Sequence, residues 1–99
     1  MAKRKKEQKR VRQPRKDALS RRLNRVVGQV QGIARMVEED RYCVDVLVQL
    51  SAVKAALTQV SLELIEDHTK GCVRRAIRDG DGEDEAIEEL MDVLKKLAK

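Results

Sequence analysis

The sequence predicts an all-α protein whose protomer has two long helices in an antiparallel hairpin and a short third helix. The chain of 99 residues has no Trp or Phe and a single Tyr. Its core must therefore come from aliphatic side chains, a composition that favours packed helices over sheets. Apolar residues recur at helical spacing, and no strand-like alternation is found. Because so short a chain buries little surface alone, we also expect it to associate.

The first part of the chain is strongly basic. Residues 1–25 hold twelve Lys or Arg against two acids, whereas residues 26–99 hold ten bases against fifteen acids. Residues 1–16 lack apolar periodicity and contain Pro14, which predicts a basic, disordered N-terminal arm before a helical domain at residues 17–99. No secretion signal is found, and no window approaches a membrane span, so we expect a soluble, cytoplasmic protein without a membrane partner.

The first helix follows the arm. Asp17 is a plausible N-cap, and the segment EEDRY marks the end of the helix. Six residues at alternating spacings of four and three form one apolar stripe. These are Leu19, Leu23, Val26, Val30, Ile33 and Val37.

A second helix is predicted from about Val44 to Ile65, and it is apolar on most sides. Fourteen of these 22 residues are apolar, as expected of a helix that packs against several neighbours. Gly71 and the segment RDGDG indicate where the helix frays and stops. The acidic segment GEDEAIEEL then begins a third, shorter helix, because negative charges favour a helix N-terminus. Lys95, Lys96 and Lys99 favour its C-terminus.

Three residues have the side chains of a soft-metal site. His68 and Cys72 are four apart and share one face of a helix, and Cys43 is the third possible ligand. If the helix continues from Cys43 to Cys72, its rise of about 1.5 Å per residue separates the thiols by roughly 43 Å. Two antiparallel copies would instead bring Cys43 of one chain beside His68 and Cys72 of the other. Two thiolates and an imidazole favour Cu(I), although Zn(II) with a fourth ligand would also fit.

These residues also have two other interpretations. A free Cys is often a small buried apolar residue, and a single His is often a packing or surface residue. Cys72 as a nucleophile with His68 as its base is conceivable, but the sequence offers no oxyanion-binding or phosphate-binding loop. We therefore predict that the protein is not an enzyme.

Several segments resemble the copper-sensing CsoR branch of the CsoR/RcnR family of metal-sensing repressors. They are RLNRVVGQVQGIARMVEEDRYC, VQLSAVKAAL, DHTKGC and AIEELMDVL, and the resemblance covers roughly residues 17–97. It implies a homodimer and a homotetramer built as a dimer of dimers, with Cys43, His68 and Cys72 as Cu(I) ligands shared between subunits. Tyr42 and Glu88 match a pair that connects this site to the third helix. The resemblance also implies a repressor that binds operator DNA without a helix-turn-helix and leaves it on Cu(I) binding, which derepresses copper efflux and resistance genes.

The basic residues offer a surface for DNA. Neutralising duplex phosphates releases counterions, so the basic first quarter of the chain predicts salt-sensitive binding. Arg21, Arg22 and Arg25 are the expected contacts on the first helix, and Lys54 extends them. The family has a further basic position where this chain has Gln59. A solvated basic tail, or one that contacts RNA or an anionic membrane surface, is the alternative.

Two other functions remain open. Cys43 and Cys72 could serve a thiol- or persulfide-responsive repressor of the same family, although persulfide-sensing members lack the intervening His. A cytosolic copper or zinc buffer would use the same ligands with an incidental basic arm.

Overall fold

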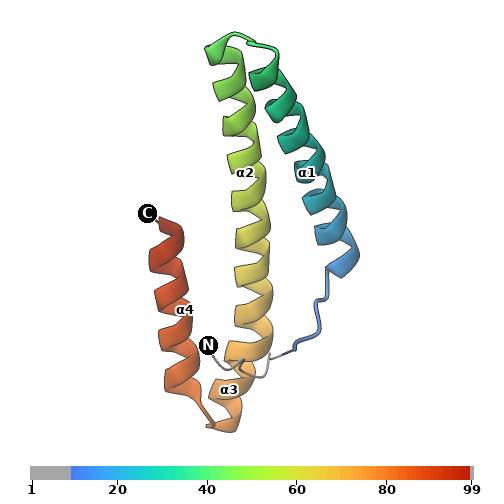
Figure 1. The fold of residues 1–99 in the computed structure, drawn as a ribbon. Coiled ribbons are helices and arrows are strands. Elements are labelled where there is room, and N and C mark those ends of the chain that lie inside the picture. Colours follow the sequence, from blue (N-terminus) through green and yellow to red (C-terminus); the bar gives the residue numbers. More distant parts are fainter. Residues whose placement is uncertain (1–9, 99) are drawn as a thin grey trace, which may run out of the picture.

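The computed structural model describes residues 10–98, in which all regular structure is helical (Figure 1). Residues 1–9, which form most of the predicted arm, and Lys99 lie outside the described residues. The elements are α1 (Lys16–Glu38), α2 (Cys43–His68), the π-helical turn η1 (Thr69–Val73), α3 (Arg74–Asp79) and α4 (Glu83–Ala98). Because α2, η1 and α3 form one continuous helix of 37 residues, the prediction of three helices is confirmed.

Helix α1 starts slightly earlier than predicted. Its N-cap residue is Arg15, and Asp17 lies in the first turn, so the expectation that Asp17 caps the helix is wrong. The carboxylate still favours this end of the helix through the dipole. At the other end, Asp40 takes a left-handed backbone conformation with φ of 58°, and the helix ends at Glu38 in the predicted EEDRY segment.

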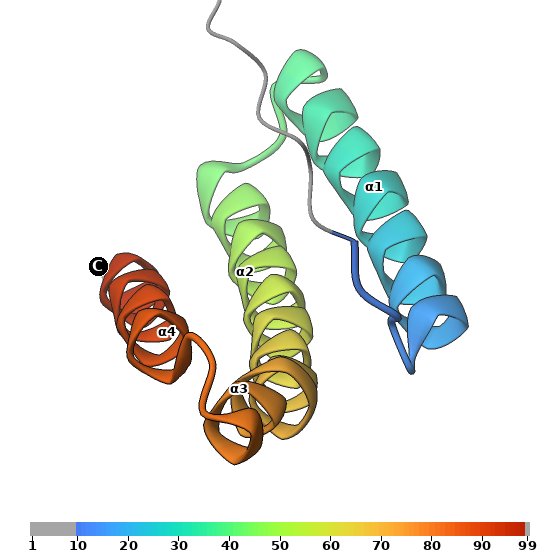
Figure 2. The same cartoon turned by 90° about the horizontal axis from the view of Figure 1, so that it is seen from below.

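The two long helices pack side by side as the predicted antiparallel hairpin (Figures 1 and 2). Val26 and Ile33 from α1 and Val53 from α2 form the buried core between them. Leu19, Val26 and Ile33 are the buried members of the predicted stripe, spaced by seven residues or two helical turns. The other members are exposed because α2 covers only one narrow strip of α1.

The long helix does not stop at Gly71. It continues through the π-helical turn to Asp79 and ends in the predicted RDGDG segment, so the predicted stop is confirmed and the fraying expected at Gly71 is absent. Gly80 ends it with φ of 66°, and the backbone N–H groups of Gly80 and Asp81 donate to the carbonyls of Ile77 and Ala76. This is a Schellman arrangement, for which glycine is favoured because it has no Cβ.

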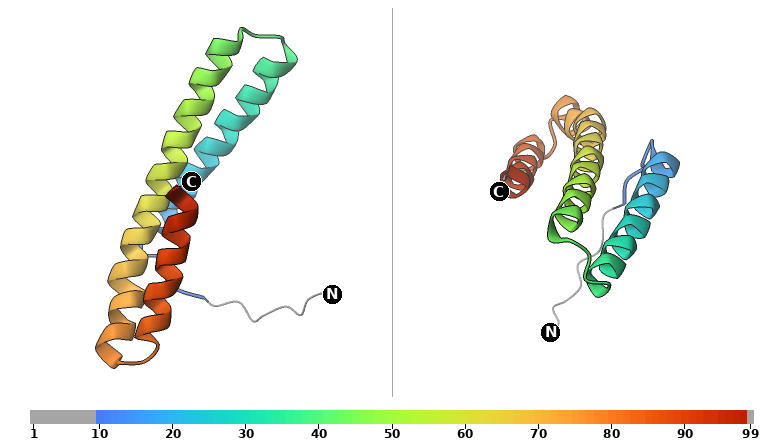
Figure 3. Two further views of the ribbon diagram at one scale, coloured as in Figure 1. Left: turned by 90° about the vertical axis from the view of Figure 1, so that its left-hand side faces the viewer. Right: turned by 90° about the horizontal axis from the view of Figure 1, so that it is seen from above.

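Helix α4 turns back along the long helix, on the side of α2 away from α1 (Figure 3). Its backbone approaches η1 and α3 at the bottom of the molecule. Further up, α2 and α4 line an apolar groove of about 700 Å³ that includes Leu57, Leu62, Leu94 and Leu97. Helix α4 is thus held mainly at its acidic N-terminal end.

The isolated chain leaves much apolar surface uncovered. Leu47 and Val48 of α2 are 60% and 58% exposed, and the radius of gyration is 17.9 Å, against about 13 Å for a compact domain of this length. By length and hydropathy, the helix Cys43–Asp79 is also apolar enough to cross a membrane. This corrects the expectation that no segment approaches a span. A helix at the centre of an assembly of several chains has the same composition.

Candidate functional site

His68 and Cys72 lie together near the lower end of the long helix. Both are half-buried, and both line one hollow of about 860 Å³ between the long helix and the segment that precedes α1. His68 is the last residue of α2, and Cys72 lies in η1. The structure therefore brings together two of the three predicted ligands, an imidazole and a thiol.

A π-helical turn begins directly after His68 and contains Cys72, a feature that the sequence did not predict. The turn spans Thr69–Val73 and contains Gly71. Single π-helical turns inside α-helices often occur at functional sites, because they change the direction of the side chains that follow. The position of Cys72 relative to His68 therefore depends on this turn as well as on their spacing in the sequence.

Cys43 lies at the opposite end of the same helix. It is the first residue of α2 and is exposed. A continuous helix over 29 residues separates Cys43 from Cys72 by about 43 Å, whereas the Cα atoms of a disulfide lie within about 7 Å. One chain cannot bring these thiols together, either around a metal or in a disulfide. Accordingly, residues 10–98 contain no group of three His, Cys, Asp or Glu side chains that could hold a metal.

Tyr42 and Glu88 are also apart within one chain. Tyr42 is the N-cap residue of α2 and is 69% exposed, at the end remote from His68. Glu88 is exposed on α4, the helix that starts beside η1. A connection between this pair and the ligands would, like the site itself, need a second chain.

The predicted DNA contacts differ in their surroundings. Arg21, Arg25 and Lys54 are exposed, and Lys54 borders the groove between α2 and α4. Arg22 instead points to α2, where it pairs with Glu63. Its position on the flank of the apolar stripe accounts for this orientation.

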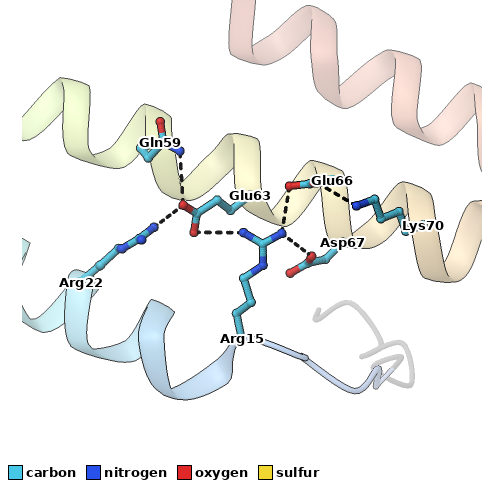
Figure 4. Close-up of polar contacts among 7 residues, drawn as sticks. All are labelled: Arg15, Arg22, Gln59, Glu63, Glu66, Asp67 and Lys70. Atoms are coloured by element: carbon cyan, nitrogen blue, oxygen red, sulfur yellow. Dashed lines mark hydrogen bonds and ion pairs between the residues drawn. The ribbon is translucent and has the colours of Figure 1, made fainter.

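Arg22 belongs to a cluster of ion pairs that joins the start of α1 to the end of α2 (Figure 4). Arg15 lies 2.9 Å from Glu66, 3.0 Å from Asp67 and 3.6 Å from Glu63. Glu63 and Asp67 are mostly covered, with side-chain exposures of 12% and 11%. The second oxygen of Asp67 is buried with no hydrogen-bond partner among the described residues. This cluster fixes the chain that enters α1 against the turn that carries His68.

The contacts of this cluster lower the pKa values of two of its glutamates. Hydrogen bonds donated by Arg22 and Gln59 lower the pKa of Glu63 below its ordinary value. Hydrogen bonds donated by Lys70 and Arg15 lower the pKa of Glu66 in the same way. Their hydrogen bonds and charges outweigh the cost of partial desolvation, so both acids are stabilised in the ionised form.

Acid should weaken this cluster. A carboxyl group whose pKa is lower in the folded state stabilises the fold above its unfolded pKa, about 4.3 for glutamate, and this stabilisation is lost as pH falls through the folded pKa. We expect Glu63→Gln to have a lower melting temperature than wild type at pH 7 and a smaller further decrease below pH about 4.3. Thermal unfolding followed by circular dichroism between neutral and acidic pH measures both.

The matched control for this prediction is Glu89→Gln. Glu89 is exposed on α4 and makes no ion pair within residues 10–98. Its replacement should leave the acid profile unchanged. A Glu63→Gln variant with the same acid profile as wild type would show that the cluster does not contribute to stability.

Comparisons with known proteins identify relatives of this chain. A family model described as a metal-sensitive transcriptional repressor matches residues 15–96. The chain is 60% identical over 84 residues to the copper-sensing transcriptional repressor CsoR of Bacillus subtilis, covering 85% of this chain and 82% of that protein. It is 57% identical over 65 residues to the copper-sensing transcriptional repressor RicR of Mycobacterium tuberculosis, covering 66% and 68%. The crystal structure of the copper-sensing repressor CsoR with Cu(I) from Geobacillus thermodenitrificans has a TM-score of 0.83 at 46% identity, covering 92% of this chain and 95% of that one.

Proposed function

Because the chain belongs to the family of metal-sensitive transcriptional repressors, we propose that it represses transcription in its metal-free form and is released from operator DNA by Cu(I). The genes that it controls would serve copper efflux or resistance. Its relatives from B. subtilis and M. tuberculosis and the solved structure from G. thermodenitrificans are all described as copper-sensing. The observation that carries the proposal is the pair His68 and Cys72 in one hollow, with Cys43 at the far end of the same helix.

The ligand set is suited to Cu(I) when two chains contribute to it. An antiparallel pair of long helices places Cys43 of one chain beside His68 and Cys72 of the other, which gives two equivalent sites in a symmetric dimer. Two soft thiolates and one imidazole provide the coordination that Cu(I) prefers. Tyr42 and Glu88 would then lie around the imidazole and fix its orientation through the nitrogen that does not bind the metal.

The uncovered apolar surface supports assembly with further copies of the same chain. Exposed apolar residues on α1 and α2 include Val30, Leu47 and Val48, and Met91 is exposed on α4. An uncovered surface of this kind is typical of a protein interface. We propose a homodimer through α1 and α2 and a dimer of dimers through α4. A soluble, cytoplasmic assembly of this kind would also cover the apolar helix Cys43–Asp79.

Cu(I) and DNA would each lower the affinity of the protein for the other through thermodynamic linkage. If Cu(I) binds more tightly to a form of the assembly that binds DNA weakly, DNA must lower the affinity for Cu(I) by the same factor. Arg21, Arg25 and Lys54 would contact the operator, and Arg22 would do so after leaving Glu63. Arginine suits such contacts because its guanidinium group can donate two hydrogen bonds to one phosphate.

Anaerobic DNA binding tests this function. The reduced, metal-free protein should bind a duplex from its own promoter region, with an affinity that falls as salt rises. One equivalent of Cu(I) per chain should weaken this binding by about 5-fold to 150-fold, the usual range of allosteric coupling. Fluorescence anisotropy of a labelled duplex measures both effects.

The same titration separates the alternatives. A copper or zinc buffer would show no preference of the metal-free protein for its own promoter. A thiol- or persulfide-responsive repressor would leave DNA on oxidation or persulfide treatment and would ignore Cu(I). Release by Zn(II) but not by Cu(I) would contradict the metal assignment.

A further inference from the structure

A second group of basic residues lies on η1 and α3, beyond the predicted DNA contacts. Residues 69–78 contain Lys70, Arg74, Arg75 and Arg78 and no acid, and all four cations are exposed. Lys70, Arg74 and Arg78 are spaced by four residues, so like charges lie next to one another along this helix. Such pairs destabilise a helix, a cost that a bound polyanion would offset.

The chain before α1 adds more positive charge at the same place. Arg10 and Arg12 line the hollow beside His68 and Cys72, together with Arg75. Figure 1 shows this segment running from the start of α1 to the lower end of the long helix. The ion pairs of Arg15 hold it there, because they fix the residue that follows Pro14 to Glu66 and Asp67.

The local charge balance differs between this surface and the start of α1. Arg15 and Arg22 are matched by carboxylates of α2, whereas no ion pair to Arg10, Arg12 or Arg75 occurs among the described residues. Among residues 10–98, Asp67 is the single acid that lines the hollow, and one of its oxygens is bound by Arg15. Lys70 and Arg78 are paired as well, with Glu66 and Asp79. Among the described residues of this surface, the positive charge without an ion pair therefore lies on Arg10 and Arg12 before α1 and on Arg74 and Arg75 of α3.

We propose that Arg10, Arg12, Arg74 and Arg75 form a second DNA-contact surface, which binds the phosphate backbone beside the metal ligands. The inference rests on the proposed function, since it concerns the same DNA. A duplex carries one negative charge per about 1.7 Å of its axis, so several cations gathered around one hollow can each meet a phosphate group. Contacts of this kind position the protein and do not read the sequence. Because His68 and Cys72 line the same hollow as Arg10, Arg12 and Arg75, a bound metal would lie close to this surface.

The double variant Arg12→Ala/Arg75→Ala tests the proposal in the reduced, metal-free protein. Anisotropy titrations at several salt concentrations should use a duplex from the promoter region and an unrelated duplex of equal length. We expect affinity at low salt to fall by roughly tenfold for both duplexes, because phosphate contacts are lost. The slope of log affinity against log salt should become shallower by at least about 0.9, the amount for one phosphate contact.

Two further variants test whether the effect depends on the position of the charge and on the charge itself. Arg35→Ala/Arg41→Ala removes the same charge at the other end of the hairpin and should leave affinity and slope unchanged. Arg12→Lys/Arg75→Lys keeps the charge and should restore most of the affinity. Helix content and the amount of Cu(I) bound per chain should match wild type in all variants, which shows that the fold and the metal site are intact.

Absence of the second DNA-contact surface and absence of DNA binding altogether would give different results in these titrations. If wild type binds its promoter but the double alanine variant has the same affinity and salt slope, the second surface does not exist. A loss confined to the promoter duplex would indicate base contacts and would also overturn the proposal. If wild type binds neither duplex, the proposed function itself fails.

Discussion

Replacing Cys72 with Ser is expected to give a repressor that stays on DNA in the presence of Cu(I). Serine removes one soft thiolate, and its hydroxyl group is a poor Cu(I) ligand at neutral pH. The metal-free variant should bind promoter DNA within about threefold of wild type, because Cys72 lies outside the predicted DNA contacts. Added Cu(I) should then change the affinity by less than about twofold, against about 5-fold to 150-fold for wild type. Anaerobic anisotropy titrations measure both quantities.

Thr69→Ala is the matched control for Cys72→Ser. Thr69 is exposed in the same π-helical turn and has no ligand of the soft type. This variant should respond to Cu(I) as wild type does, which shows that changing the turn alone does not abolish the response. Full release of Cys72→Ser by Cu(I) would contradict the assignment of this thiol as a ligand.

His68→Ala separates metal sensing from thiol chemistry. Without the imidazole, two thiolates remain, so the response to Cu(I) should be lost or strongly weakened. A repressor that works through Cys43 and Cys72 alone would keep its response to persulfide or oxidant in this variant. Because the two thiols of one chain are about 43 Å apart along the helix, any such linkage would also have to join two chains.

The helices were largely predictable because their apolar residues repeat with the helical period. Leu19, Val26 and Ile33 were all in the predicted stripe and are the buried residues of α1. The long helix runs past Gly71 because a single glycine weakens a helix by only about 1 kcal/mol, which neighbouring contacts can compensate. It ends instead in the RDGDG segment, the other stop that the sequence indicated. The π-helical turn has no distinct sequence pattern, so its position, directly after His68 and including Cys72, appears only in the structure.

The ion-pair cluster was missed for a different reason. Arg15 and Glu66 are 51 positions apart, and only the register of the hairpin brings them together. The sequence did contain an indication of this cluster, because Glu63, Glu66 and Asp67 share one side of an otherwise apolar helix. An acidic group of this kind indicates a basic partner on a neighbouring helix. The separation of Cys43 from His68 and Cys72, by contrast, follows directly from helix continuity.

A site shared between two chains predicts that two inactive variants restore copper binding when they assemble together. Cys43→Ser lacks one ligand, and Cys72→Ser lacks another, so each should bind much less Cu(I) alone. In a symmetric dimer of one chain of each kind, one site lacks both cysteines. The other site has Cys43 from one chain and His68 and Cys72 from its partner, and it is complete.

Co-expression of the two variants should therefore recover about one quarter of the wild-type sites, because half of randomly formed dimers are mixed and each has one complete site. Anaerobic competition with a colorimetric Cu(I) chelator measures this fraction. Co-expression of Cys43→Ser with Cys43→Ser/Cys72→Ser also gives mixed dimers, but no chain supplies Cys43, so binding should not recover. If the first mixture also fails to recover while both variants form wild-type assemblies, the ligands do not come from two chains, and the antiparallel pairing is wrong.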